Sequence, residues 1–97
     1  MIKSRQILNF NKFEGDIVKI YNYYGKKNIC GDRIHEARCK HRLTQGELAA
    51  QLQVAGINIE RDSISRIEIG TRFVADYELR ELARILKVSV DWLLGIE

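Results

Sequence analysis

From Asp32 onward, apolar residues recur every three or four positions, which is the spacing of one helix face. Asp32 precedes the first of these segments and is a candidate N-cap. Thr44 precedes the second, and Glu47 follows three residues later, which is the capping-box pattern. An irregular stretch over residues 53–59 then interrupts the periodicity. The pattern therefore predicts two consecutive helices ahead of this stretch.

Three further helices are predicted after the irregular stretch. The third spans residues 61–69 and ends at Gly70, which readily adopts the left-handed conformation of a helix C-terminus. Asp76 is a candidate cap for a fourth helix, whose apolar residues follow i, i+3, i+4, i+7 spacing. Ser89 is a candidate cap for a short last helix. Five short helices with tight connections predict an all-α bundle of non-antiparallel helices.

Residues 1–30 differ from the domain over residues 31–97 and are expected to form an N-terminal extension. Strand-favouring residues cluster between Gly15 and Gly25, consistent with a short strand or an arm. A lone strand has no evident partner, so stable sheet is not expected. Alternatively, residues 14–16 can be encoded by codons that contain a ribosome-binding sequence and Val18 by a GTG start codon, in which case the native product is expected to begin near Val18.

The length and composition describe one small soluble domain. Of the 97 residues, 45% are hydrophobic and 30% charged, which argues against disorder. No apolar run is long enough to span a membrane, and the N-terminus lacks the apolar segment of a signal peptide. A chain of this size also disfavours a large catalytic cleft. We therefore expect a cytoplasmic protein that has no membrane partner.

The net charge of +3 is unevenly distributed along the chain. Residues 1–32 carry +3, residues 33–72 carry +2 and residues 73–97 carry −2. This mild excess of positive charge permits binding to nucleic acid without requiring it. The positive charge ends before the C-terminal stretch begins.

The third predicted helix has one polar and one apolar side. At about 100° per residue, Ile64 and Ile67 fall opposite the polar side, and Glu68 lies at the border. The polar side consists of Arg61, Asp62, Ser65 and Arg66. Arginine matches guanine O6 and N7, and a helix of this size fits the major groove. The alternative interpretation, a solvated helix face, is common for any exposed helix.

The start of the second predicted helix favours the DNA interpretation. Thr44 and Gln45 open this helix, so its free N–H groups and the positive end of its dipole can meet a phosphate. Gln45 can also donate from its side chain. Gly46 lowers helix propensity by about 1 kcal/mol relative to alanine. A close approach of the backbone to DNA would explain a glycine at this position. A glycine at a helix N-terminus, however, also costs little helix stability.

Four separated segments resemble the Cro/cI-type (XRE) helix-turn-helix family. They are RIHEAR over residues 33–38, LTQGELAA over 43–50, SISRIE over 63–68 followed by Gly70, and LKVSVDWLL over 86–94. Together they cover about residues 31–95, in the order found in that family. The resemblance implies a five-helix, lambda-repressor-like fold whose second and third helices form the helix-turn-helix.

The resemblance also implies roles for individual residues. It implies that Arg61, Asp62 and Arg66 read base edges. Ser65 lies on the same face of the helix. The phosphate contacts expected are Thr44, Gln45, Ser63, Thr71 and Arg72. It further implies a buried or half-buried ion pair between Arg38 and Glu68, which agrees with the border position of Glu68 on the helix.

The sequence departs from the family pattern in two places. The connection between the second and third helices is about five residues longer than usual, and Ala55–Ile59 looks like the insertion. Because Ile57 and Ile59 are apolar, we expect this insertion to pack against the domain. Ile69 stands where the family commonly has asparagine, which removes one phosphate contact.

Catalytic and metal-binding interpretations find little support. Cys30, His35, Cys39 and His41 match no standard zinc-finger spacing, so we expect no metal and two reduced thiols. The sequence has no glycine-rich phosphate loop and no nucleophile elbow. We expect a protein that is not an enzyme and has no cofactor.

The sequence thus predicts a prokaryotic or phage repressor that binds a double-stranded, pseudo-palindromic operator as a homodimer. The predicted dimer contacts are Val90, Trp92 and Leu93. One alternative is an antitoxin that uses the same DNA-binding domain and also binds a toxin, for which Tyr21, Tyr23 and Tyr24 form the only candidate surface. The other is a protein-interaction module that has this fold and binds no duplex DNA, even at low salt.

Overall fold

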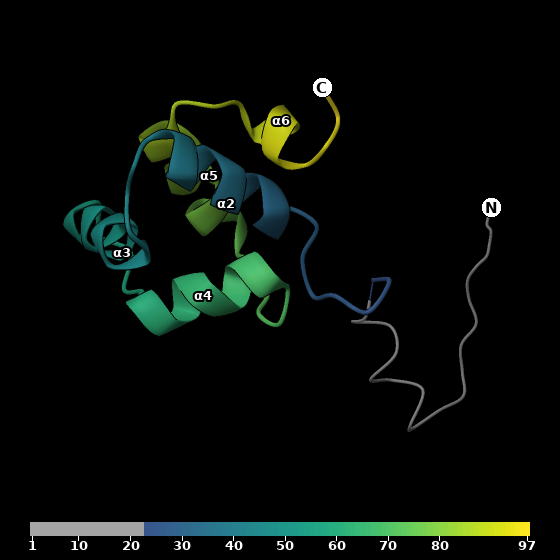
Figure 1. Cartoon of the computed structure of the whole chain (residues 1–97), viewed down its shortest axis with the longest axis horizontal. Helices are drawn as coiled ribbons and strands as arrows, with labels where there is room; N and C mark the ends of the chain where they lie inside the picture. The colour runs from purple at the N-terminus through teal and green to yellow at the C-terminus, as the bar shows by residue number, and fades with distance from the viewer. Residues whose placement is uncertain (1–22) are drawn as a thin grey trace.

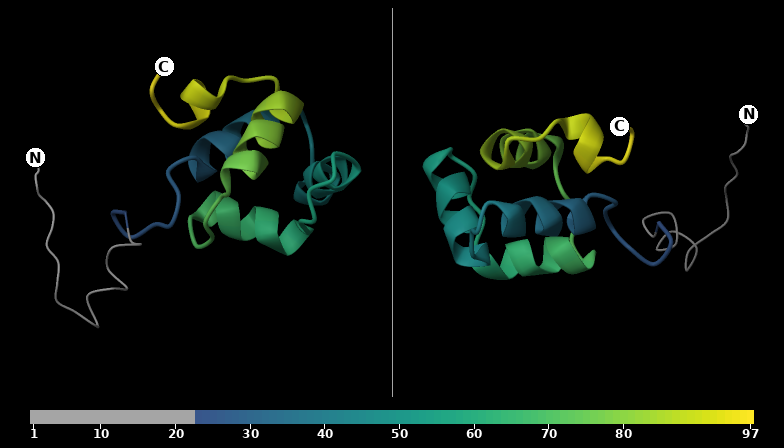
Figure 2. Two further views of the ribbon diagram at one scale, coloured as in Figure 1. Left: turned by 180° about the vertical axis from the view of Figure 1, so that it is seen from behind. Right: turned by 45° about the horizontal axis from the view of Figure 1, so that its top comes forward.

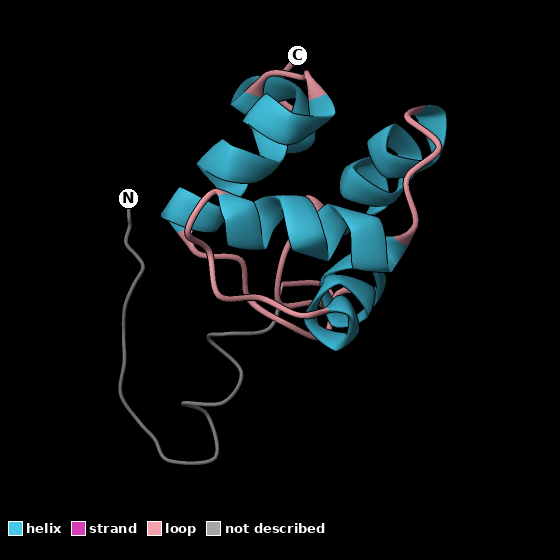
Figure 3. Ribbon diagram, turned by 90° about the vertical axis from the view of Figure 1, so that its left-hand side faces the viewer, coloured by secondary structure: helices cyan, strands magenta, loops and turns pink. Residues whose placement is uncertain are grey.

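A computed structural model describes residues 23–97 of the chain. Within this range the backbone forms helices and loops, with a single isolated bridge between Tyr23 and Lys26 (Figure 3). The helices are α2 (Gly31–Lys40), α3 (Gln45–Val54), α4 (Arg61–Ile69), α5 (Asp76–Leu86) and α6 (Val90–Leu93). The prediction of an all-α, five-helix domain is therefore confirmed. No helix in the described residues has the length and hydropathy needed to cross a bilayer.

Helix α2 runs through the middle of the molecule (Figure 1). Helix α4 lies along one side of it, α5 and α6 lie along the other, and α3 closes one end (Figure 2, right). The core between them contains nine fully buried large side chains. These are Ile34, Leu48, Leu52, Ile59, Ile64, Ile67, Leu82, Leu86 and Leu93. Every helix contributes at least one of them, so the helices form a single packed unit.

Two of the predicted helix caps are confirmed. The hydroxyl of Thr44 accepts the backbone N–H of Glu47 at 3.0 Å, and the Glu47 carboxylate accepts the backbone N–H of Thr44 at 2.8 Å. This is a complete capping box at the start of α3. At the start of α6, the hydroxyl of Ser89 accepts the backbone N–H of Trp92 at 2.9 Å. Both helices therefore begin where local sequence chemistry placed them.

The other two predicted caps are wrong by one or two residues. Helix α2 begins at Gly31, one residue before Asp32, and the Gly31 N–H donates to the side-chain oxygen of Asn28 at 2.8 Å. Helix α5 begins at Asp76 itself, and its N-cap Ala75 donates its backbone N–H to Glu78 at 3.0 Å. In each case a side chain that the capping pattern did not single out accepts the backbone N–H at the helix start. The aspartate therefore lies in the first turn and is not the cap.

The long connection between α3 and α4 packs against the domain, as predicted. Helix α3 continues to Val54, so the irregular stretch starts two residues later than expected. Ile59 is 2% exposed and Ile57 packs at the edge of the core. The side-chain amide of Gln53 donates to the carbonyl of Ile59 at 2.7 Å. These contacts fix the chain where it enters α4.

Residues 27–30, expected in the extension, pack as part of the helical domain. The backbone N–H of Lys27 donates to the carbonyl of Gly70 at 2.8 Å. The Asn28 side-chain amide donates to the carbonyls of Ile67 at 3.0 Å and Arg72 at 2.8 Å. Cys30 is buried in the core. Three features of the predicted extension lie largely or wholly outside the described residues. They are the expected strand or arm over residues 15–25, the alternative start near Val18 and the side chain of Tyr21.

Candidate nucleic-acid interface

Helix α4 is anchored by its apolar side and presents its polar side to solvent. Ile64 and Ile67 are both fully buried. Arg61, Asp62 and Arg66 are exposed on the other side of the helix, with Ser63 and Ser65 half-buried between the two sides. The end of the helix is set by Gly70, whose φ of 88° lies in the left-handed region that favours glycine. The helix thus presents two exposed guanidinium groups on a short element that is held against the core.

An ion pair orders the exposed face of α4. The Nε of Arg66 lies 3.2 Å from an Asp62 carboxylate oxygen, one helical turn away. The Arg66 side chain nevertheless keeps 47% of its surface exposed and Asp62 keeps 83%. Since arginine has five N–H donors, this single contact leaves the outer fork of Arg66 available for bases or phosphates. Asp62 therefore orients the arginine without covering it.

The N-terminus of α3 lies beside the N-terminus of α4. A Cβ on Gly46 would lie 3.7 Å from the Cδ of Arg61, so the arginine stem passes over this glycine. Thr44, at the same end of α3, is exposed and keeps its hydroxyl hydrogen after accepting from Glu47. The structure therefore brings the first turn of α3 next to the first base-reading candidate on α4.

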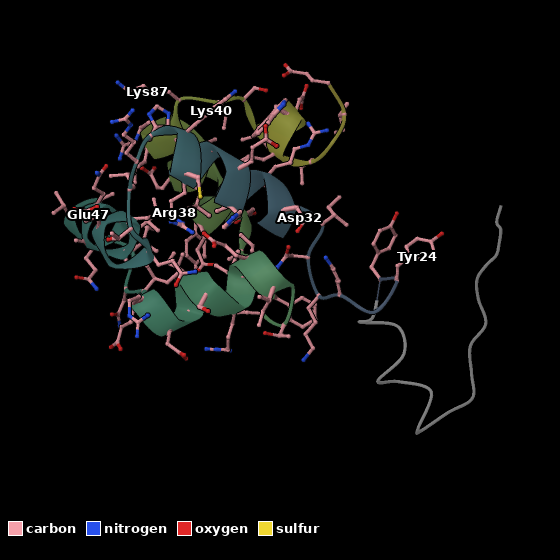
Figure 4. The ribbon with its side chains drawn as sticks, viewed as in Figure 1. Tyr24, Asp32, Arg38, Lys40, Glu47 and Lys87 are labelled. Atoms are coloured by element: carbon pink, nitrogen blue, oxygen red, sulfur yellow. The ribbon has the colours of Figure 1, made fainter. Side chains whose placement is uncertain are left out.

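The predicted ion pair between Arg38 and Glu68 is present and is part of a larger cluster. The Nε of Arg38 donates to Glu68 at 2.6 Å, and a second guanidinium nitrogen donates at 3.1 Å. The side-chain amide of Gln45 donates to the same carboxylate at 3.0 Å, and the Nδ1 of His35 lies 2.9 Å from it. Figure 4 shows Arg38 between α2 and α4. One carboxylate on α4 therefore joins α2 and α3.

The environment of Glu68 keeps it ionised. Only 5% of its side chain is exposed, and burial alone would raise its pKa. The hydrogen bonds from Arg38, His35 and Gln45 outweigh burial, so the pKa of Glu68 lies below its ordinary value. The cluster also fixes Gln45, one of the predicted phosphate contacts. One of its two amide hydrogens is used by Glu68, and the other remains to be donated.

Arg72, another predicted phosphate contact, is held inside the protein by Glu78. Its two terminal nitrogens donate to the two oxygens of the Glu78 carboxylate at 2.9 and 3.1 Å. Burial would raise the pKa of Glu78, but the hydrogen bonds from Arg72 and from the Ala75 backbone lower it overall. The charge of Arg72 is therefore neutralised within the chain. Thr71, by contrast, is exposed, with its hydroxyl 3.3 Å from the carbonyl of Arg66.

The three predicted dimer contacts lie in different environments. Leu93 is fully buried in the core of its own chain, so it presents no surface to a partner. Val90 and Trp92 are half-buried. The Arg33 guanidinium lies 4.9 Å from the centre of the Trp92 ring and donates to the Trp92 carbonyl at 2.8 Å. Trp92 is therefore already stacked on one side.

Two contributors to this region were not predicted from the sequence. His35 precedes Arg38 by three residues, so helical spacing was the available signal that both meet Glu68. Asn28 precedes a helix, where an asparagine often accepts a backbone N–H. Its two contacts with carbonyls at and beyond the end of α4 have no local signal, because they join residues 39 and 44 positions apart.

The two cysteines and two histidines do not all meet at one point. Among residues 23–97 no group of three or more His, Cys, Asp or Glu is placed to hold a metal ion. Cys30 is buried and Cys39 is exposed, and both are free thiols. Burial raises the pKa of the Cys30 thiol to about 11. The Cys39 sulfur lies 3.7 Å from the Nε2 of His35, and His41 instead contacts the carbonyl of Leu86 at 2.7 Å.

Comparison with known proteins defines the class. The sequence profile of the helix-turn-helix family matches residues 34–93. The chain belongs to this family, of the Cro/cI (XRE) type, which is a class of DNA-binding transcriptional regulators. The sequence-based identification of the family is therefore confirmed.

A solved structure shares the fold. The chain is similar to the P22 c2 repressor protein, whose crystal structure was determined in complex with synthetic operator 9T. The TM-score is 0.62 at 24% sequence identity, and the match covers 72% of this chain and 98% of that one. No curated protein sequence matches the chain.

Proposed function

We propose that this protein is a sequence-specific, double-stranded DNA-binding regulator that acts as a repressor. The observation that carries the proposal is the orientation of α4, which is pinned by Ile64 and Ile67 with Arg61 and Arg66 exposed. A helix of this diameter fits the major groove, and the arginine fork matches guanine O6 and N7. Family membership supports this interpretation over a merely solvated helix face.

Base reading is assigned to the exposed face of α4. Arg61 and Arg66 are proposed to donate to base edges, and Ser65 lies between them on the same side. Asp62 is proposed to hold Arg66 at its observed angle, or to accept from cytosine N4 when Arg66 moves to a base. Specificity then depends on a rigid spacing between two guanidinium groups.

Contacts to the DNA backbone are assigned around the start of α3. Thr44 and Gln45 lie where the first N–H groups and the positive end of the helix dipole attract a phosphate. Gln45 is proposed to donate its remaining amide hydrogen, because Glu68 fixes the other. Ser63 and Thr71 complete the proposed set. The geometry favours a structural role for Arg72 rather than a phosphate contact.

Repression is proposed to result from occupancy of promoter DNA by a homodimer. Two copies of α4 would enter successive major grooves about 34 Å apart on a pseudo-palindromic operator. Val90 and Trp92 are the surface residues of the predicted dimer contact, since Leu93 is buried. The P22 c2 repressor, which has the same fold, was crystallised with an operator.

Selection from a random library of duplex DNA with the purified full chain tests the proposal. We expect a site with two related half-sites whose centres are one helical turn apart. Recovery of a single half-site would remove the dimer but keep DNA reading. Failure to retain any duplex, even at low salt, would overturn the proposed function and favour the protein-interaction module. A stable complex with the product of a neighbouring toxin gene, in addition to a selected site, would favour the antitoxin.

A further inference from the structure

The segment that precedes α2 is attached to the C-terminal end of α4. The backbone N–H of Lys27 donates to the carbonyl of Gly70, and Asn28 donates to the carbonyl of Ile67. The backbone N–H and the hydroxyl of Thr71 lie within hydrogen-bonding distance of the Arg66 carbonyl. These contacts occupy several of the C-terminal carbonyl groups that α4 cannot satisfy by itself. The segment is therefore a fixed part of this helix end.

Two lysines of this segment lie against the α4–α5 loop. The stem of Lys26 passes so close to Gly70 that a Cβ there would lie 2.8 Å from the Lys26 Cδ. The ammonium group of Lys27 lies 5.6 Å from the centre of the Phe73 ring. Both lysines are exposed, so their stems are packed on the loop while their charged ends reach water.

The charges of these lysines are available to an anionic partner. Lys27 has no carboxylate within ion-pair distance in the described part of the chain. Lys26 lies 3.7 Å from Asp32, but 83% of the Asp32 side chain is exposed, and such surface pairs are weak. Arg72, on the same loop, is neutralised by Glu78. The free positive charge at this end of α4 therefore comes from the preceding segment.

We propose that Lys26 and Lys27 bind DNA phosphates at the C-terminal end of α4. The proposal rests on the proposed function and extends it to a surface outside the helix-turn-helix. A helix of nine residues is about 14 Å long, close to the major-groove width of about 12 Å. When the polar face of α4 lies in the groove, both helix ends therefore approach the phosphates that border it. The negative end of the helix dipole would repel a phosphate there, and the two lysines offset it.

The test measures how the affinity of the full chain for its selected duplex depends on salt. The slope of log affinity against log salt is negative, and each phosphate contact that is lost reduces its magnitude by about 0.9. The double variant Lys26→Gln, Lys27→Gln should therefore have a slope lower by about 1.8 for each protomer bound. Its affinity deficit relative to the unmodified protein should shrink about tenfold for each protomer bound between about 50 and 200 mM salt. Preference among operator sequences should not change, because phosphates carry no direct sequence information.

A matched control removes the same charge from the opposite side of the molecule. Lys40 and Lys87 lie on the side away from α4 (Figure 4). Lys40→Gln with Lys87→Gln should leave the salt slope unchanged. The proposal is overturned if the slope of the Lys26 and Lys27 variant equals that of the unmodified protein, or if the control lowers it equally.

A second variant predicts a gain of affinity, which misfolding cannot produce. Asp32 lies beside Lys26, so its negative charge should repel the same phosphate. Asp32→Asn should tighten duplex binding severalfold at low salt, and the gain should fade as salt screens the charges. Unchanged or weaker binding would contradict the proposal. If the unmodified protein retains no duplex, the proposed function fails, whereas retention with unaltered slopes defeats only this extension.

Discussion

Glu68 connects α4 to both of the helices that precede it. Its carboxylate accepts hydrogen bonds from Arg38 on α2 and Gln45 on α3, and it lies within 2.9 Å of His35. Arg38 also donates to the carbonyl of Leu43, in the turn between these two helices. A single side chain on the proposed reading helix thus fixes it against both helices that precede it.

Removal of this carboxylate should strongly destabilise the fold. Glu68→Ala would leave the Arg38 guanidinium, 11% exposed, without its partner, and such losses cost about 3–5 kcal/mol when the pair is buried. Urea unfolding followed by circular dichroism measures the change. The control is Glu81→Ala, which removes a carboxylate whose partners Arg80 and Arg84 are 76% and 62% exposed. That variant should lose much less stability than Glu68→Ala, because both arginines stay in contact with water. Similar losses of unfolding free energy in both variants would show that the Glu68 cluster stabilises the fold no more than an ion pair with exposed arginines does.

Arg66 should determine preference at one base pair. Arg66→Ala is expected to weaken binding to the selected site by about 1–3 kcal/mol and to relax the choice of base at one position of each half-site. Electrophoretic shifts on single-base variants of the site measure this. Arg84→Ala removes an exposed arginine from α5 and should leave base preference intact. Unchanged preference in the Arg66 variant would mean that α4 does not read the bases.

At the scale of elements, α2 and α4 pack closely because a glycine stands at the contact. A Cβ on Gly31 would lie 2.3 Å from the backbone carbonyl oxygen of Ile67, so the two helix backbones have no room for a side chain. Gly46, at the start of α3, has no such constraint, because the nearest heavy atom to its Cβ would be 3.7 Å away. The two helical glycines therefore serve different purposes.

Substitution of these two glycines should separate their roles. Gly31→Ala must push α2 away from α4, and overpacking of this kind costs about 1–3 kcal/mol. Gly46→Ala should leave stability unchanged or raise it by up to about 1 kcal/mol, since alanine is the better helix former. Thermal unfolding measures both. Equal effects on stability would contradict the close helix contact, and weaker duplex binding by a stable Gly46→Ala protein would indicate that DNA approaches the α3 backbone.

Local chemistry in the sequence was sufficient for some elements and insufficient for others. The caps at Thr44 and Ser89 were predictable, because donor and acceptor lie within three residues. The start of α2 was not, because it depends on Asn28, which is also held by carbonyls 39 and 44 residues away. The ion pair of Arg72 was also not predictable. A basic residue after the reading helix resembles a phosphate contact, and nothing in the local sequence indicates that its guanidinium pairs with Glu78 in the fold.

At the scale of the whole molecule, two buried carboxylates make stability depend on pH. Glu68 and Glu78 each join different segments of the chain, and the pKa of each is lowered below the ordinary value of 4.5. Around pH 4.5 and below, the folded state therefore binds fewer protons at these two groups than the unfolded state does. Their contribution to stability is complete above about pH 4.5 and is lost as the pH falls through the lower values of the folded protein.

Acid titration should reveal this dependence. The unfolding free energy should decrease as pH falls below about 4.5, with little change contributed by these groups between neutral pH and that point. Glu78→Gln should be less stable at neutral pH and should lose less on acidification, because one of the two titrating groups is gone. Chemical denaturation at a series of pH values measures how the unfolding free energy of each protein changes with pH. Parallel curves for the two proteins would show that Glu78 does not contribute.

The overall arrangement was more predictable than its details. Apolar periodicity placed the first four helices and the Ser89 cap placed the last, and the angular positions of Ile64 and Ile67 on α4 predicted which side of this helix faces the core. The sequence could not reveal that Leu93 is buried, because the short α6 is too brief for periodicity to separate its inner and outer sides.

The burial of Ile59 holds the entry to α4 in place. Gly56 has a φ of 90° and no atom within 4 Å of a Cβ position, and the nearby Val54 is 91% exposed. Gly56 ends α3, since its N–H donates to the carbonyl of Gln53 and the next N–H, of Ile57, donates to the carbonyl of Leu52. A peptide inserted at this exposed turn should therefore leave the direction of the helix proposed to touch the operator unchanged, as long as Ile59 stays in the core.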